Sequence, residues 1–277
     1  MSQIHRLRSD SPIGIIGATE IEIGLLKKRF ELIKKERVGN ARFFRGYFSG
    51  KELILVESGI GYAHAANACI HMIERFSPAA IFSFGLAGSV DKNTKIGDIL
   101  LTTHLLWVED MEMLKVKKTY ILDENIVNII SNILDKYNLN FKMGKVLTVP
   151  YFIFKLDERC RIGRELSVKA VEMEGAAIAG EATNHRIPLM ALRMISDDMS
   201  TREIDYGMVV ESLGKPTLKA GLRFSLAHRR DFLEVFRFGR QVRRLGRRLS
   251  EIGARIVEEI IPLPMDSIQE MDFHVQQ

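Results

Sequence analysis

The chain has 277 residues, 46% hydrophobic content and a net charge of +5, which is enough apolar material for one large core. No stretch approaches the eighteen consecutive apolar residues of a membrane-spanning helix, and the N-terminus has no signal-peptide apolar region, so we expect neither a spanning nor a secreted protein. The two cysteines, Cys69 and Cys160, lack metal-ligand spacing and favour a reduced, cytoplasmic setting.

In chain order, short apolar strands alternate with helices. We expect strands at 12–17, 42–48, 52–57, 79–84, 99–103, 145–149 and 188–195, and helices at 20–30, 62–76, 123–137, 156–166 and 175–184. The second and third strands form a hairpin, and a Gly-rich turn, Gly85 to Gly88, follows the fourth strand. The alternation predicts an α/β protein: a single three-layer domain with a central mixed β-sheet flanked by helices. We place an N-terminal tail at 1–11, this domain at 12–212 and a basic helical extension at 213–277.

Two blocks of sequence carry acids inside otherwise apolar stretches. Glu172 and Glu174 lie in residues 170–178, and Asp197 follows the buried strand 188–195. Because an ionised carboxylate is expensive in an apolar environment, acids in such places are paired or used. Ligands bind at the carboxyl ends of strands in open α/β sheets, and Glu174 also precedes a helix N-terminus. The blocks therefore predict a ligand site at one edge of the sheet.

Other candidate residues are weak when taken singly. Gly59-Ile60-Gly61 and the turn at Gly85 are more often tight turns than ligand loops, and Glu22 alone suits a solvated helix position. Together with Phe152 and the acids, however, they all fall near predicted strand ends. This co-occurrence indicates one site.

Six motifs, in order and spacing, resemble the methylthioadenosine/S-adenosylhomocysteine nucleosidases of the nucleoside phosphorylase superfamily: Gly14–Glu22, Ser58–Gly61, Gly85–Gly88, Ile96–Ile99, Val171–Ala177 and Arg193–Asp197. The resemblance covers about residues 12–205. It implies an enzyme that hydrolyses the N-glycosidic bond of 5′-substituted adenosines, such as methylthioadenosine, S-adenosylhomocysteine or 5′-deoxyadenosine, and releases adenine. It also implies a homodimer with no cofactor and no metal.

The resemblance implies roles for three acids. Asp197 would protonate adenine at N7, which requires a carboxyl group that holds a proton near neutral pH. Glu174 would accept the ribose 2′- and 3′-hydroxyl groups and, as an anion, stabilise the cationic sugar. Glu22 would orient and deprotonate the attacking water.

The remaining implied contacts surround these acids. Arg193 and Glu172 would fix the arrangement, and Met173 would contact the ribose. Phe152 would stack on the base while Ile153 offers backbone groups to its edge. The implied substrate-binding set is completed by Ser196, Gly88 and Tyr206, of which Tyr206 would close the 5′ pocket.

Hydrolysis is preferred to phosphorolysis because of the first loop. Phosphorylases of this superfamily surround phosphate with cationic groups, whereas this chain places Glu20 and Glu22 there. Two carboxylates repel phosphate, so water is the expected nucleophile.

One motif departs from the methylthioadenosine nucleosidases, which usually have serine at the position of Leu86. An apolar residue there resembles the futalosine hydrolases and the hopanoid-associated branch, which acts on adenosylhopane. Futalosine enzymes usually carry asparagine at the position of Asp197, so Asp197 favours adenine over hypoxanthine. A nucleosidase or phosphorylase acting on an adenosylhopane-type lipid therefore stays open as an alternative, as does a non-catalytic nucleoside-binding protein.

The basic charge is concentrated near the end of the chain. Residues 219–255 hold eleven Lys or Arg against three acids, a net +8, so the rest of the chain carries −3. We therefore expect no nucleic-acid partner for the main domain.

An apolar seam runs through this basic segment with alternating spacings of three and four: Val235, Phe238, Val242, Leu245, Leu249, Ile252 and Ile256. Gly239, Gly246 and Gly253 recur beside it, and because glycine costs about 1 kcal/mol in a helix interior, they indicate close approach to a neighbouring surface. Three readings are open: a helix packed on its own domain, a coiled coil, or a helix peripheral to the inner face of the membrane. The hopanoid-associated relatives also tend to carry a basic C-terminal extension.

Overall fold

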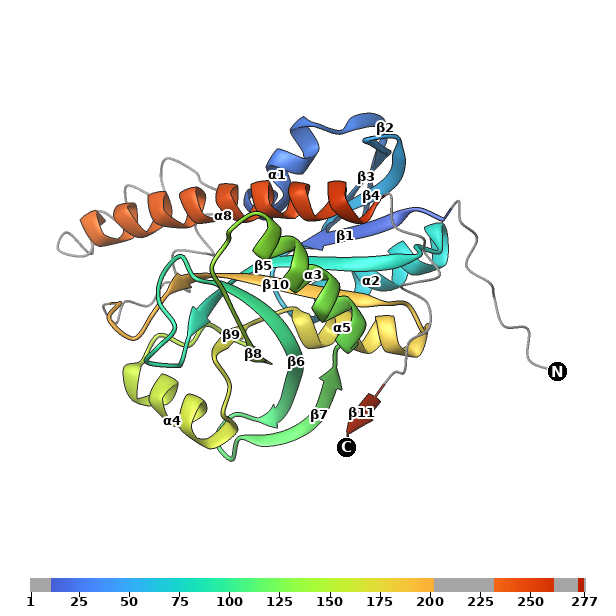
Figure 1. Cartoon of the computed structure of the whole chain (residues 1–277). Helices are drawn as coiled ribbons and strands as arrows, with labels where there is room; N and C mark the ends of the chain where they lie inside the picture. Colours follow the sequence, from blue (N-terminus) through green and yellow to red (C-terminus); the bar gives the residue numbers. More distant parts are fainter. Residues whose placement is uncertain (1–10, 202–231, 262–273, 277) are drawn as a thin grey trace.

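The computed structural model describes residues 11–201, 232–261 and 274–276, with one sheet through the centre of the molecule (Figure 1). The strands are β1 (Ile13–Gly17), β2 (Glu31–Val38), β3 (Ala41–Phe48), β4 (Lys51–Glu57), β5 (Ala80–Ser89), β6 (Ile99–Asp110), β7 (Lys115–Ile121), β8 (Phe141–Thr148), β9 (Ala170–Glu172), β10 (Leu189–Asp197) and β11 (His274–Gln276). The helices are α1 (Glu20–Lys28), α2 (Tyr62–Phe76), α3 (Glu124–Lys136), α4 (Leu156–Leu166), α5 (Gly175–Asn184) and α8 (Phe232–Ile260). The predicted α/β class, with a mixed sheet flanked by helices, is confirmed.

The pairing of the strands brings several strand ends to one edge. β1 pairs in parallel with both β4 and β5, and β5 pairs in parallel with β10. β1 and β10 are buried throughout, as expected for parallel strands covered on both faces. β10 also pairs with β6, and the pairings β6–β8, β8–β9 and β9–β5 close a ring of strands. The carboxyl ends of β1, β5 and β10 therefore lie together, and β9 runs against the last residues of β5.

The predicted Gly-rich turn at Gly85 to Gly88 is wrong, because these residues continue β5 as a strand. β10 pairs alongside them in parallel, and the antiparallel β9 takes Gly88 opposite Val171. The glycines leave room for side chains that cross the strand: a Cβ on Gly88 would lie 2.8 Å from an oxygen of Asp197. What looked like a loop sequence is thus a strand that side chains approach closely.

Helix α8 packs on the rest of the described domain, so the first reading of the basic segment is confirmed. Its apolar seam is buried in the main core at Leu245, Leu249, Ile252 and Ile256, while its arginines face outward. Figure 1 shows α8 lying beside α1, and the Ser250 hydroxyl accepts the backbone N–H groups of Leu25 and Leu26 at 3.0 and 3.2 Å. From Leu245 onward, the apolar face of α8 is therefore unavailable to lipid or to a coiled-coil partner.

Two of the three α8 glycines make the close approach that their spacing predicts. A Cβ on Gly246 would overlap the side chain of Ile21 and lie 2.9 Å from its carbonyl oxygen, and one on Gly253 would lie 3.1 Å from the ring of Phe84. A Cβ on Gly239 meets no described atom within 4 Å. Gly246 and Gly253 thus let α8 sit close to α1 and β5, the elements that lead into the predicted site.

We expect Gly246→Ala to lower the free energy of unfolding by about 1–3 kcal/mol, because the added methyl group overpacks the contact with Ile21. Gly239→Ala is the matched control in the same helix. There the substitution should stabilise the protein by up to about 1 kcal/mol, because alanine is the better helix former. Urea unfolding followed by circular dichroism measures both changes. Equal effects of the two substitutions would contradict the close contact at Gly246.

Among the residues that the structure describes, no helix is both long enough and apolar enough to cross a membrane.

Candidate active site

Glu22 lies on the first turn of α1, directly after β1, and its side chain is buried. One carboxyl oxygen accepts the Thr19 N–H at 2.8 Å and the other accepts the Leu86 N–H at 3.1 Å. The first contact belongs to an ordinary helix capping box, but the second ties Glu22 to the end of β5. Burial raises the pKa of the Glu22 carboxyl, and the hydrogen bonds from Thr19 and Leu86 only partly oppose this. A carboxyl group with a raised pKa at a strand end is a candidate base.

Glu174 stands at the N-cap of α5, just after β9, and is half-buried. Its carboxyl accepts the Gly61 N–H at 2.7 Å, which joins it to the N-terminus of α2. Burial, followed by the nearby negative charges of Glu172 and Glu22, raises the pKa of Glu174 to about 8. The carboxyl groups of Glu174 and Glu22 therefore interact electrostatically and form one acidic pair at the edge of the sheet.

Beneath this pair lies a buried scaffold that centres on Glu172. Its carboxylate forms an ion pair with Arg193 at 3.1 Å, accepts the Thr148 hydroxyl at 2.5 Å and accepts the Gly175 N–H at 2.7 Å. The guanidinium of Arg193 also donates to the Ser83 carbonyl at 3.0 Å. Because every partner is buried, removing either charge would leave the other uncompensated. Glu172 and Arg193 thus link β8, β9, β10 and β5.

Asp197 ends β10 and is fully buried. One of its oxygens accepts the Ser196 hydroxyl at 2.7 Å. The other forms an ion pair with Arg159 of α4, a residue that lies outside the six motifs. The same guanidinium donates to the Ile153 carbonyl at 2.9 Å. Asp197, Ser196 and the Ile153 backbone therefore form a second, more buried end of the site.

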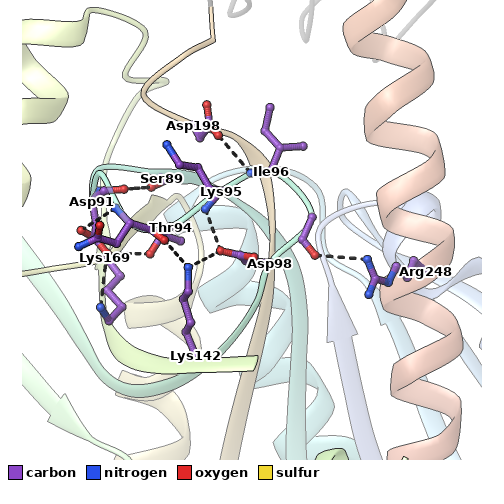
Figure 2. A network of polar contacts seen from close by, with 12 residues as sticks. Ser89, Asp91, Thr94, Lys95, Ile96, Asp98, Lys142, Lys169, Asp198 and Arg248 are labelled. Atoms are coloured by element: carbon purple, nitrogen blue, oxygen red, sulfur yellow. Dashed lines mark hydrogen bonds and ion pairs between the residues drawn. The ribbon is translucent and has the colours of Figure 1, made fainter. Parts of the chain in front are cut away.

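Asp198 follows Asp197 in sequence, but its carboxylate accepts hydrogen bonds from backbone N–H groups. Its carboxylate accepts the Ser200 N–H at 2.8 Å and the Ile96 N–H at 3.3 Å. Figure 2 shows this contact within a polar network on the loop between β5 and β6, which also reaches Arg248 of α8. Although burial acts the other way, these hydrogen bonds lower the pKa of the Asp198 carboxyl. Asp198 thus anchors the segment that carries Asp197.

The predicted site residues lie at the end formed by Glu22 and Glu174, at the end formed by Asp197, or on strand β5 between the two. The Leu86 N–H contacts Glu22 and Gly88 packs on Asp197, so the end of β5 joins the ends of the site. Phe152 is half-buried beside Ile153, and Met173 packs at the edge of the smaller apolar cluster. Tyr206 lies outside the described residues.

The arrangement suits a ligand with a polar, hydroxyl-bearing part and a flat basic part. Two adjacent carboxyl groups, Glu22 and Glu174, can accept hydroxyl protons and stabilise positive charge that develops beside them. At the other end, a buried carboxyl group and backbone polar groups can read the edge of a base. Polar side chains and backbone groups are thus concentrated at the edge of the sheet where the strands end.

Comparison with known proteins identifies the family of the chain. Residues 12–214 match the family model of the phosphorylase superfamily. The 5′-methylthioadenosine/S-adenosylhomocysteine nucleosidase of Listeria innocua is 34% identical over 200 residues, which cover 67% of this chain and 85% of that protein. That of Staphylococcus epidermidis is 31% identical over 195 residues, covering 67% and 86%.

Solved structures give the same result for the fold. An S-adenosylhomocysteine nucleosidase from Streptococcus pyogenes, in complex with 5-methylthiotubericidin, superposes with a TM-score of 0.72 at 26% identity and covers 93% of this chain and 100% of its own. The futalosine hydrolase of Helicobacter pylori has a TM-score of 0.72 at 21% identity, covering 90% of this chain and 98% of its own.

Proposed function

The chain belongs to the phosphorylase superfamily, and from this premise we propose that it is an N-ribosyl hydrolase that cleaves 5′-substituted adenosines and releases adenine. The observation that carries the proposal is the placement of Glu22, Glu174 and Asp197 at neighbouring strand ends. The curated relatives at 27–34% identity are nucleosidases for methylthioadenosine and S-adenosylhomocysteine, which supports the same substrate class here. The nucleoside is the small-molecule partner.

The roles of the residues follow from the chemistry of the bond. Cleavage leaves electrons on the purine and positive charge on the ribose, so the site needs a proton donor at the base and negative charge at the sugar. Asp197 would donate the proton, and Glu174 would bind the ribose hydroxyl groups and face the cationic carbon. Glu22, with its raised pKa, would take a proton from the attacking water.

The remaining site residues would position these groups. Phe152 would stack on the base and Met173 would contact the ribose, while Arg193 and Glu172 hold the strands in place. The Ile153 backbone, Ser196 and Gly88 line the purine end, where they surround Asp197. Tyr206 is proposed to close the 5′ pocket.

A panel of methylthioadenosine, S-adenosylhomocysteine and 5′-deoxyadenosine, followed by chromatographic detection of free adenine with and without phosphate, tests the proposal. We expect adenine from at least one nucleoside without phosphate, because the first turn of α1 carries two acids, Glu20 and the buried Glu22, and their charge disfavours phosphate. Turnover that requires phosphate would make the protein a phosphorylase. The absence of adenine from all three nucleosides would leave the lipid-linked nucleoside and the binding-protein readings.

A nucleoside with a lipid-like 5′ substituent is a second candidate substrate, favoured by two observations. The Leu86 N–H contacts Glu22, and the apolar side chain of Leu86 is only half-buried. The outward face of α8 is also strongly basic, with one acid, Glu251, among these exposed side chains: Arg237, Arg240, Arg243, Arg244, Arg247, Arg248 and Arg255. We call these seven arginines the arginine face. Because the apolar face of α8 is buried from Leu245 onward, membrane contact along this part of the helix would be electrostatic rather than insertional.

We expect the protein to co-sediment with vesicles that contain anionic lipid at low ionic strength, and to be released by salt. Replacing Arg240, Arg244 and Arg247 by glutamate should abolish sedimentation, because the charge of the arginine face is then largely cancelled. The same three positions changed to lysine keep the charge and serve as the control. Equal binding by the glutamate and lysine variants would remove the membrane proposal.

Homodimerisation is proposed from the family resemblance, and analytical ultracentrifugation tests it. A cytoplasmic location is supported by two free cysteines, of which Cys69 is buried, because a reducing compartment keeps such thiols unpaired.

A further inference from the structure

Strand β10 leaves its regular pairing with β5 one residue before Asp197. Ile195 pairs with Ala87, whereas Asp197 pairs with Gly88, so the register shifts and Ser196 has no partner in β5. The pairing of β10 with β6 ends before this point. At such a shift the extra residue is left out of the ladder and the strand bends. Because Ser196 is buried, its carbonyl group needs a hydrogen-bond donor from outside the ladder.

Helix α8 supplies this donor. The side-chain amide of Gln241 donates to the Ser196 carbonyl at 2.7 Å, and Gln241 is half-buried. The hydroxyl group of Ser196 in turn donates to the Asp197 carboxylate at 2.7 Å. A single residue therefore stands between the amide of α8 and the carboxyl group at the purine end of the proposed site. Gln241 lies outside the six sequence motifs.

The packing of α8 gives the Gln241 amide a fixed place. Gly246 lies against Ile21 of α1, one turn further along α8. Arg248 donates to the Gly97 carbonyl at 3.4 Å, and the Gly97 N–H donates to the Ile195 carbonyl at 2.9 Å. Helix α8 thus reaches two successive carbonyl groups of β10, one directly and one through the loop between β5 and β6. A support carried by a packed helix is more precise than one carried by a loop.

We propose that Gln241 is a positioning residue, which replaces the missing strand neighbour at Ser196 and so fixes the direction in which β10 presents Asp197. The inference rests on the proposed function. No proton and no electron pair passes through Gln241, because its effect is on geometry alone. A displaced carboxyl group fits the transition state less well, whereas the other contacts of the bound nucleoside remain. Loss of the amide should therefore lower kcat more than it raises KM.

Two substitutions test the proposal through kinetics. Gln241→Met removes the donor at similar length, and Gln241→Glu keeps the shape but places an acceptor beside the Ser196 carbonyl. We expect kcat for adenine release to fall by about 10–10²-fold in both variants, as for a small misplacement of a reacting group, while KM stays close to the wild-type value. An unchanged kcat in both variants, or a loss confined to KM, would overturn the proposal.

Glu259→Gln is the matched control. Glu259 lies near the other end of α8 and accepts hydrogen bonds from Lys136 and from the Tyr137 hydroxyl, both at 2.8 Å. The substitution weakens a polar contact of the same helix far from β10, so kcat and KM should both stay at the wild-type values. A loss of kcat equal to that of the Gln241 variants would mean that any loosening of α8 slows the reaction, and it would overturn the specific role of Gln241.

A second readout does not depend on turnover. The chain has two Ser-Asp pairs, which begin at Ser9 and Ser196, so serine labelled with ¹³C at its carbonyl and aspartate labelled with ¹⁵N give two NMR signals. Ser9→Ala removes one signal and assigns the other. The Ser196 signal should move in both Gln241 variants and stay in Glu259→Gln, and an unmoved signal in the Gln241 variants would overturn the proposal. If the wild type releases no adenine, the proposed function fails, while this signal still decides whether Gln241 holds Ser196.

Discussion

Asp197→Asn is expected to lower kcat/KM for adenine release by about 10²–10⁴-fold, the range that a positioned general acid contributes. Asparagine has the shape of aspartate but no proton to give to a leaving purine. It also leaves the buried Arg159 without its counter-charge, so the variant should be less stable as well. Steady-state kinetics at a temperature where both proteins stay folded, which circular dichroism establishes, separates the two effects.

Asp198→Asn is the matched control for this experiment. Asp198 is adjacent in sequence and buried, but its carboxylate holds only the backbone of Ile96 and the residues around Ser200. This substitution should lower the melting temperature while most of the activity remains. If both substitutions reduced kcat/KM to the same extent, the loss would come from disruption of the strand end, and Asp197 would have no special role.

The sequence predicts most of the fold because the relevant signals are local. Helices α2, α4 and α5 begin and end at the predicted residues, and the hairpin of β3 and β4 turns where Ser49 and Gly50 indicate. β2 was not predicted, because this edge strand is mostly exposed and lacks apolar alternation. Nor was the continuation of β5 through Gly85–Gly88. There the neighbours β9 and β10 override the preference of glycine for turns, and that information lies far away in sequence.

The same distinction applies to the site. Glu172, Glu174 and Asp197 are conspicuous in the sequence because acids rarely stand in apolar stretches. Arg159 stands in a helix with many charges, and little distinguishes it from Arg161 until α4 is packed against β10. Its one local signal is its spacing of three residues from Ile162, since these two form the buried face of α4. An arginine on the apolar face of a helix therefore predicts a buried charged residue, just as an acid in an apolar strand does.

Glu174→Gln should have effects of opposite sign on activity and on stability. Glutamine cannot supply a negative charge to the ribose, so we expect kcat, compared above about pH 8 where Glu174 is ionised, to fall by at least about 10²-fold, as for the loss of a group that stabilises transition-state charge. Its hydrogen bond from Gly61 can be kept by the amide oxygen, so KM for the nucleoside should change less than kcat. Chromatographic detection of adenine measures both constants.

The stability effect follows from the pKa of Glu174, which burial and the charges of Glu172 and Glu22 raise to about 8 from an ordinary value of 4.5. Between these values the folded protein binds the proton more tightly than the unfolded chain, so the contribution of Glu174 to stability is complete below about pH 4.5 and is lost as the pH rises through about 8. Glutamine stays neutral and avoids this loss. Glu174→Gln should therefore raise the melting temperature at about pH 8.5, by an amount corresponding to a few kcal/mol at most, and the gain should shrink toward about pH 5. A variant that is less active and less stable at every pH would mean that Glu174 serves the packing of α5. A variant that loses activity yet gains stability at alkaline pH would show that ionised Glu174 lowers the free energy of unfolding while it is needed for the reaction.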